Sequence, residues 1–179
     1  FAPYKMISYG DTQVAYVGVS TPESFTKSTP AYFQDANGNY IYSFCEDADG
    51  TAFYNQVQSA VDSARAEGAE FVILVGHPGE NGITERWSAG SLIGHIRGVD
   101  ACIDGHSHET TLSMIVKDAD GKDVIVTQTG TKLANIGKMT IHTDGTISTE
   151  LISEVVPSEV NRTYTVQKND SLSRIAKKL

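Results

Sequence analysis

The first two thirds of the chain carry apolar runs of the kind that form buried strands. Residues 12–19 are rich in β-branched and aromatic side chains and are followed by a Thr-Pro pair, which stops a strand. Residues 71–75 form an uninterrupted apolar run, which is typical of a strand covered on both faces. The run over 99–103 has a similar character. The pattern therefore predicts three buried strands.

Between these runs, apolar positions recur at the spacing of an amphipathic helix. The longer set comprises Phe53, Val57, Ala60, Val61 and Ala64. Asp49 can cap the start of this helix and Gly68 can close its end. The shorter set comprises Leu92, Ile93 and Ile96. It predicts a second helix that stops at Gly98.

The rest of the pattern predicts a long connection and two hairpins. Residues 22–49 have no sustained period, so we expect a surface connection with a short strand near 40–44. Four short strands follow residue 108 and flank two Asp-Gly turns: 111–116 with 124–129, and 138–142 with 146–152. The predicted fold class is α/β (α+β), with antiparallel hairpins at the C-terminal side.

Composition places the chain among globular proteins and limits its partners. Its 179 residues suffice for one domain and an appendage. No apolar run approaches the roughly 18 residues of a membrane span, so no transmembrane segment is predicted. The net charge of -8 argues against a nucleic-acid polymer as partner, and a phosphorylated substrate would need bound cations. Residues 1–4 resemble neither a start nor a signal sequence, which suggests a cut point.

Three histidines stand directly after predicted strands, beside glycines. His77 follows the strand 71–75 in a Gly-His-Pro-Gly loop, and His106 and His108 follow the strand 99–103 in Gly-His-Ser-His. Open α/β sheets place ligands beyond the carboxyl ends of strands, and glycine lets the backbone approach an ion closely. Alternate residues of an extended turn can face two ions about 3.5–4 Å apart, as in two-metal hydrolases. The three histidines are therefore candidate metal ligands, against the alternative of three unrelated loop histidines.

The remaining histidines and the cysteines suggest no site. His95 lies within the shorter predicted helix, where a surface or packing role is expected, and His142 should be exposed on a hairpin strand. Cys45 and Cys102 lack the spacing of a zinc ribbon or a redox pair.

The order of these elements resembles bacterial and animal 5′-nucleotidases, which are calcineurin-like metallophosphoesterases. The resemblance rests on Val-Asp-Ala-Cys-Ile-Asp-Gly-His-Ser-His over 99–108, on the Gly-His loop before it and on the hairpins after it. The strand at 14–19 and the loop at 21–33 extend it to roughly residues 4–152. It implies that residues 1–153 are the carboxy-terminal half of a metallophosphoesterase β-sandwich flanked by helices.

The same resemblance implies a metal-dependent phosphoric ester hydrolase with two divalent ions, zinc or manganese. His77 and His106 would bind one ion and His108 the other. The family's other ligands and its catalytic His come from upstream Asp-x-His, Gly-Asp and Gly-Asn-His-Asp/Glu motifs, which this chain lacks. We therefore expect a 5′-nucleotidase or 2′,3′-cyclic nucleotide phosphodiesterase whose missing N-terminal half completes the site, and no activity from the isolated chain.

The end of the chain resembles a second family. Residues 154–162 predict a linker, and residues 163–179 look like the first strand and helix of a LysM module, which binds peptidoglycan. Asn169 stands where glycine is usual, and an ordinary amphipathic tail is the alternative. Together the two resemblances imply a bacterial, extracytoplasmic protein that is secreted, periplasmic or cell-wall-associated.

Two other functional classes stay open at this stage. One is a cell-wall-binding or structural module with a vestigial metal site, and the other is a non-catalytic zinc protein with three histidines on one ion. If the chain is half of a metallophosphoesterase domain, apolar strand faces or an unpaired edge should be left bare where the missing half packs, so we expect association with an upstream fragment or self-association.

Overall fold

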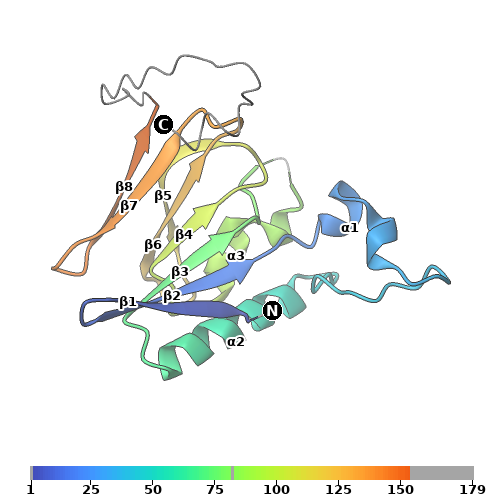
Figure 1. The fold of residues 1–179 in the computed structure, drawn as a ribbon, viewed down its shortest axis with the longest axis horizontal. Coiled ribbons are helices and arrows are strands. Elements are labelled where there is room, and N and C mark those ends of the chain that lie inside the picture. The colour runs from blue at the N-terminus through green and yellow to red at the C-terminus, as the bar shows by residue number, and fades with distance from the viewer. Residues whose placement is uncertain (1, 82, 154–179) are drawn as a thin grey trace, which may run out of the picture.

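The fold is described for residues 2–81 and 83–153 of a computed structural model (Figure 1). The predicted linker, 154–162, and the LysM-like segment, 163–179, lie outside the described residues. All described strands and helices fall between Tyr4 and Ile152. Among these elements, no helix is both long and apolar enough to cross a membrane.

A six-stranded mixed sheet forms the centre of the protein, with the strand order β1-β2-β3-β4-β6-β5. The strands are β1 (Tyr4–Tyr9), β2 (Thr12–Val19), β3 (Phe71–Gly76), β4 (Ala101–Asp104), β5 (Thr110–Lys117) and β6 (Asp123–Thr129). β2, β3, β4 and β6 are parallel neighbours, whereas β1 and β5 are antiparallel strands at the two edges. The predicted α/β class is confirmed.

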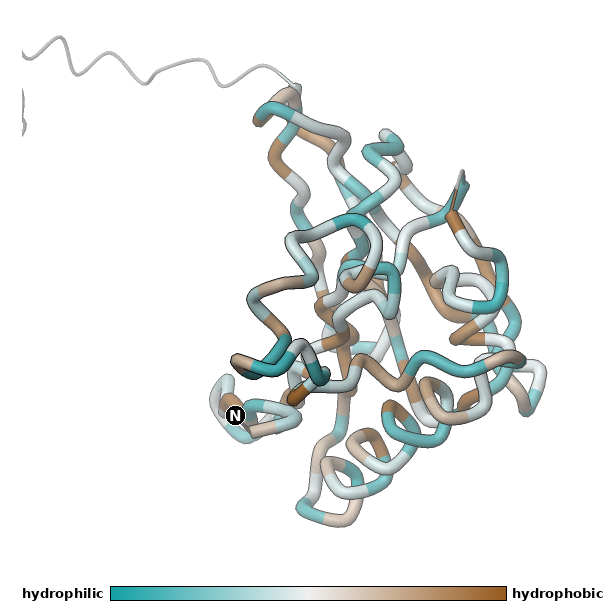
Figure 2. Tube along the Cα trace, turned by 90° about the vertical axis from the view of Figure 1, so that its right-hand side faces the viewer, coloured by the Kyte–Doolittle hydropathy of each residue, from teal (hydrophilic) through white to brown (hydrophobic). Residues whose placement is uncertain are grey.

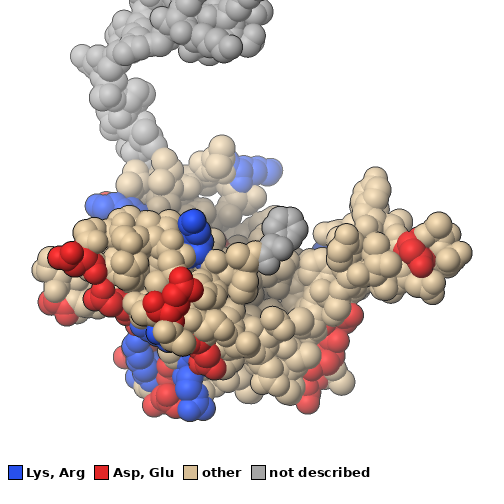
Figure 3. Space-filling model, turned by 60° about the horizontal axis from the view of Figure 1, so that its bottom comes forward, with Lys and Arg blue, Asp and Glu red and all other residues tan. Residues whose placement is uncertain are grey.

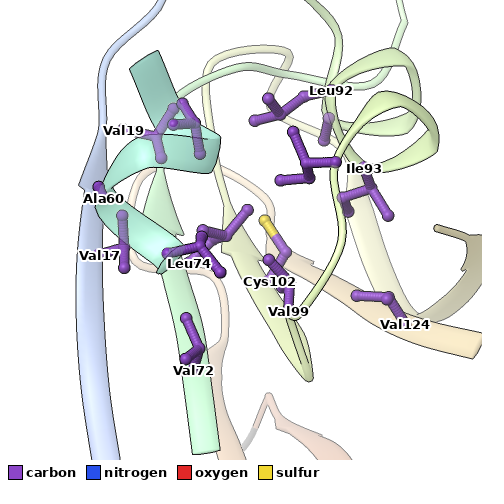
Figure 4. Packing of buried hydrophobic residues seen from close by; sticks show 14 of the residues in the cluster. Val17, Val19, Ala60, Val72, Leu74, Leu92, Ile93, Val99, Cys102 and Val124 are labelled. Atoms are coloured by element: carbon purple, nitrogen blue, oxygen red, sulfur yellow. The ribbon is translucent and has the colours of Figure 1, made fainter. Parts of the chain in front are cut away.

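Two helices cover one face of this sheet. α2 (Thr51–Ala66) connects β2 to β3, and α3 (Ala89–His95) connects β3 to β4. In Figure 2 the turns of α2 alternate between hydrophilic and hydrophobic colours, as an amphipathic helix requires. Side chains from both helices and from the sheet meet in one buried cluster (Figure 4), which includes Val17, Ala60, Val72, Leu74, Leu92, Ile93, Val99, Cys102 and Val124. Cys102 is thus part of the core.

An antiparallel hairpin covers part of the opposite face. It consists of β7 (Ile136–Ile141) and β8 (Ile147–Ile152), which form a separate two-stranded sheet. Its inner side chains pack with the second hydrophobic cluster, which contains Val14, Ile73, Ala101, Met139, Ile141 and Ile147. Successive residues of β3 therefore face different layers, which explains why its sequence is continuously apolar.

The connection from β2 to α2 projects from the body as an arm (Figure 1). It contains the short helix α1 (Ser24–Lys27) and the 3₁₀ helix η1 (Pro30–Phe33). Aromatic rings hold it together, with Phe25 lying 4.7 Å from Tyr40 and 5.3 Å from Phe44 between ring centroids. On the face drawn in Figure 3, the outer part of the arm is mostly uncharged.

The structure corrects two details of the sequence prediction and adds a second carboxylate to the predicted cap of α2. β1 was not expected; it pairs with β2 through a two-residue turn in which Gly10 has a φ of 63°. The predicted strand near 40–44 is wrong, because this segment makes only one isolated bridge, between Gln34 and Tyr40. The start of α2 is satisfied by two carboxylates: Asp49 accepts from the Thr51 amide, and Asp47 accepts from the amides of Gly50 and Ala52.

Candidate functional site

His77 and His106 lie beside each other because they follow adjacent parallel strands. β3 pairs with β4 up to Val75 and Ile103, and each strand ends shortly before its histidine. The backbone N–H of His77 donates to the carbonyl of Val19 at 2.9 Å, which extends the pairing toward β2. The two imidazole centroids are 4.9 Å apart with an interplanar angle of 58°.

Glycines make this approach sterically feasible. A Cβ atom on Gly105 would lie 3.0 Å from Nδ1 of His77. A Cβ atom on Gly79 would lie 3.3 Å from the Cδ2 atom of His106, and the φ of Gly79 is 91°. Side chains at either position would therefore push an imidazole away, which gives a physical reason for the glycines in both loops.

His106 and His108 share an unusual backbone conformation. Their φ angles are 79° and 61°, so both lie in the left-handed region. His77 and His108 are exposed, whereas His106 is half-buried. Partial loss of hydration lowers the pKa of His77 from its usual 6.5, and the charges of His106 and His108 lower it further. His106 and His108 are thus close enough to His77 to affect its ionisation.

A buried carboxylate, Glu23, joins the site from the start of the arm. Its Oε2 lies 2.9 Å from Nε2 of His106, and its Oε1 accepts from the amide and the hydroxyl of Thr84 at 2.7 and 2.6 Å. Burial opposes ionisation of Glu23, but the hydrogen bonds from His106 and Thr84 outweigh this effect and lower its pKa to about 2. The sequence interpretation missed Glu23. Its signal was a Thr-Pro-Glu directly beyond the carboxyl end of β2, the neighbour of β3.

A second polar group, centred on Gln128 at the end of β6, ties the histidine loops together. The fully buried Gln128 side chain accepts from the Glu109 amide at 2.8 Å and lies 3.2 Å from Ser107 Oγ. Ser107 Oγ in turn accepts from the Glu80 amide at 3.0 Å. The loop after β3 and the loop after β4 are therefore held to each other and to β6.

Asp104, the last residue of β4, supports the same two loops. Its Oδ1 accepts from the Gly79 amide at 3.0 Å, and its side chain is buried. Burial raises the pKa of Asp104 to about 6, against the lowering effect of the backbone N–H groups of Gly79 and Gly105; the nearby Glu80 raises it further. A carboxylic acid with a pKa of about 6 beside the histidines indicates an unusual electrostatic environment.

His95 and His142 lie elsewhere, as expected for residues without a ligand role. Both are exposed. His95 stacks on Tyr54 with 4.3 Å between ring centroids, and its Nδ1 lies 2.7 Å from the Ser91 carbonyl. His142 contacts Ser148 on the neighbouring strand of its hairpin.

The donor set fits part of a metal centre. Within residues 2–81 and 83–153, no group of three or more His, Cys, Asp or Glu side chains is arranged to hold an ion. His77 and His106 nevertheless offer paired imidazoles on loops fixed by glycines and buried hydrogen bonds, and His108 is close enough to shift the pKa of His77. Imidazole nitrogens are common ligands of transition-metal ions, so these residues could supply part of a ligand set.

Solved structures share this fold. A 5′-nucleotidase precursor from Thermus thermophilus is 24% identical with a TM-score of 0.61, over 86% of this chain and 30% of that one. The sulfate thiohydrolase SoxB of the same organism is 21% identical (TM-score 0.62; 84% and 24% of the chains). The calcineurin-like phosphoesterase YfkN from Bacillus subtilis is 17% identical (TM-score 0.55; 84% and 50%).

The chain thus spans no more than half the length of any of these three proteins. No protein-family model and no curated protein sequence matches it. The described sheet, its two covering helices and its antiparallel hairpin therefore share the fold of one part of 5′-nucleotidase and calcineurin-like phosphoesterase structures.

Proposed function

We propose that the complete protein hydrolyses phosphate esters with two divalent metal ions, zinc or manganese, and that nucleotides are its substrates. The observation that carries the proposal is the pair of imidazoles, His77 and His106, 4.9 Å apart at the carboxyl ends of adjacent parallel strands. The structures with this fold include a 5′-nucleotidase and a calcineurin-like phosphoesterase. A 5′-nucleotidase or a 2′,3′-cyclic nucleotide phosphodiesterase fits both observations.

In this proposal the chain supplies one side of the site. His77 and His106 would hold one ion and His108 the other, and an N-terminal half would contribute the remaining ligands and the catalytic histidine. When bound, the ions would polarise the phosphoryl group and lower the pKa of a bound water. Asp104 and Gln128 keep the two histidine loops in register, so that the imidazoles need not reorganise during the reaction.

The test compares the isolated chain with the parent protein that includes the upstream segment. The isolated chain should release phosphate from AMP or open 2′,3′-cyclic AMP at no more than background rate. The parent protein with zinc or manganese should be active and should lose activity in His77→Ala and His106→Ala. His142→Ala, at an exposed histidine outside the site, is the matched control and should leave the rate unchanged.

Two results would contradict this proposal in different ways. Robust turnover by the isolated chain that disappears in His106→Ala would show that these residues already contain a complete site. An inactive parent protein that still binds peptidoglycan would favour the alternative, a cell-wall-binding or structural module with a vestigial site. One observation supports this alternative: among the described residues, no three His, Cys, Asp or Glu side chains are arranged to hold a metal ion.

Exposed apolar side chains on the strands predict association. They are Ile7, Val75, Leu112, Ile115 and Ile136, each between 38% and 54% exposed. Because such surfaces seldom stay bare, we expect the chain either to bind an N-terminal half or to self-associate. Sedimentation velocity of the purified chain should show dimers or larger species at high concentration, and addition of the N-terminal half should replace them with a 1:1 complex. A chain that stays monomeric and does not bind the N-terminal half would contradict this expectation.

A further inference from the structure

We propose that Glu23 is a positioning residue: it holds the Nε2–H of His106 and leaves Nδ1 as the ring nitrogen that would bind a metal ion. The inference rests on the proposed function and specifies how one ligand of that site is oriented. A metal-binding imidazole commonly donates its other N–H to a carboxylate or carbonyl, which fixes both the tautomer and the plane of the ring. Glu23 is the carboxylate that contacts His106 in this way.

The hydrogen bonds around Glu23 leave little freedom for another arrangement. Oε2 lies 2.9 Å from Nε2 of His106, with the two side chains only 6% and 13% exposed. Oε1 accepts both the amide and the hydroxyl of Thr84. Because a carboxylate only accepts, Nε2 of His106 must carry the proton. With both oxygens occupied, Glu23 is better placed to orient a ligand than to bind an ion itself.

The backbone around Glu23 fixes the carboxylate in turn. The Glu23 amide donates to Thr21 Oγ1 at 3.1 Å, and the Glu23 carbonyl accepts from the amides of Thr26 and Lys27 at 2.9 and 2.7 Å. Thr84 directly precedes η2 (Glu85–Trp87), on the connection that leaves β3. Segments that follow β2, β3 and β4 therefore meet at one hydrogen-bonded group, and the orientation of His106 depends on all three.

The substitution Glu23→Gln makes a specific change to this group. Thr84 presents two donors to Oε1, so the amide oxygen of Gln should stay there and its NH₂ should face His106. Nε2 must then become an acceptor, and the proton moves to Nδ1. The variant should thus present the wrong nitrogen to an ion while preserving size and shape. Glu23→Ala removes the acceptor without adding a donor and should give a mixture of tautomers.

The experiment is long-range ¹H–¹⁵N NMR of the histidine rings in the metal-free chain, at a pH about one unit above the usual histidine pKa of about 6.5. His106 signals are assigned by their loss in His106→Gln. We expect the Nε2–H tautomer in the unmodified chain and the Nδ1–H tautomer in Glu23→Gln. Glu80→Gln is the matched control: it removes a nearby carboxylate that contacts Gln128 and Thr111, and it should not change the His106 tautomer.

A zinc titration followed through the same signals supplies the second readout. Zinc should perturb Nδ1 of His106 in the unmodified chain, and Glu23→Gln should lower the zinc affinity about 10–100-fold. An unchanged Nε2–H tautomer in folded Glu23→Gln, or perturbation of Nε2 by zinc, would overturn the inference. The expected tautomers in the metal-free chain, together with a parent protein that includes the upstream segment and still binds no zinc, would support the role of Glu23 and contradict the proposed metal site, so the two failures are distinguishable.

Discussion

The free energy of unfolding of the metal-free chain is expected to fall by roughly 3 kcal/mol through Asp104 alone as the pH rises from about 3 to about 7. Burial raises the pKa of Asp104 from 3.8 to about 6. The folded state therefore binds a proton more tightly than the unfolded state does. The stabilisation is fully present below pH 3.8, and it is lost as the pH rises through 6, because ionised Asp104 must stay out of water.

Asp104→Asn should abolish this loss of stability. An asparagine oxygen can still accept from the Gly79 amide, but the side chain no longer ionises. Urea unfolding at several pH values in the presence of a chelator gives the difference between the two proteins. The difference in the free energy of unfolding between the two proteins should change by roughly 3 kcal/mol from about pH 3 to about pH 7, on top of a constant offset. Asp118→Asn, a buried aspartate in the turn between β5 and β6, is the control, and a similar pH effect there would contradict the assignment to Asp104.

Two other titrating groups near the site, His77 and Glu23, change the free energy of unfolding with a different sign or in a different pH range. The pKa of His77 is lowered, so its unfolded state binds more protons and its contribution to stability rises as the pH approaches 6.5. The pKa of Glu23 is lowered to about 2, so its stabilisation is present above pH 4.5 and is lost only in stronger acid. Both contributions cancel when Asp104→Asn is compared with the unmodified chain.

Leu74→Ala is expected to lower the free energy of unfolding by about 2–5 kcal/mol, which approaches the whole stability of many domains. Leu74 is fully buried at the centre of β3, and Figure 4 shows it between the strands and the covering helices. Removal of its side chain loses apolar burial and leaves a cavity that α2 and α3 cannot close, since their other contacts hold them in place. Guanidinium unfolding followed by circular dichroism measures the effect as a lower midpoint at an unchanged slope.

Val75→Ala is the matched control for the same strand. Val75 is the next residue of β3, and 44% of it is exposed on the opposite face. Its truncation should cost less than about 1 kcal/mol, because it loses β-propensity but opens no cavity. Equal losses of stability for the two substitutions would mean that α2 and α3 do not pack on the face of the sheet that carries Leu74.

Sequence patterns predicted the helices and strands in which buried side chains follow a regular pattern along the chain. The helical spacing from Phe53 to Ala64 predicted α2, and the continuous apolar run at 71–75 predicted β3, because each reports burial on a defined face. β1 was missed because it is an edge strand with mostly exposed residues, so burial left no pattern in it. The short strand expected near 40–44 is absent because Tyr40 and Phe44 pack with the rings of the arm.

The candidate site was predictable only in part. The adjacency of the loops that carry His77 and His106 followed from two parallel strands with glycine neighbours. Glu23 and Gln128 could not be found in this way, because their roles depend on hydrogen bonds across 83 and 19 positions of the chain, to His106 and Glu109 respectively. A buried polar residue at a strand end looks the same in sequence whether it supports a site or caps a turn.

The left-handed backbone of His106 and His108 implies a trade-off between folding and ligand placement. For a side chain other than glycine, this conformation is disfavoured by roughly 1–2 kcal/mol per residue. Glycine would adopt both φ angles, 79° and 61°, without that penalty. A sequence selected for stability alone would therefore place glycine at both positions. The loop instead holds two imidazoles where the backbone resists a side chain, so the placement of these histidines costs the loop stability.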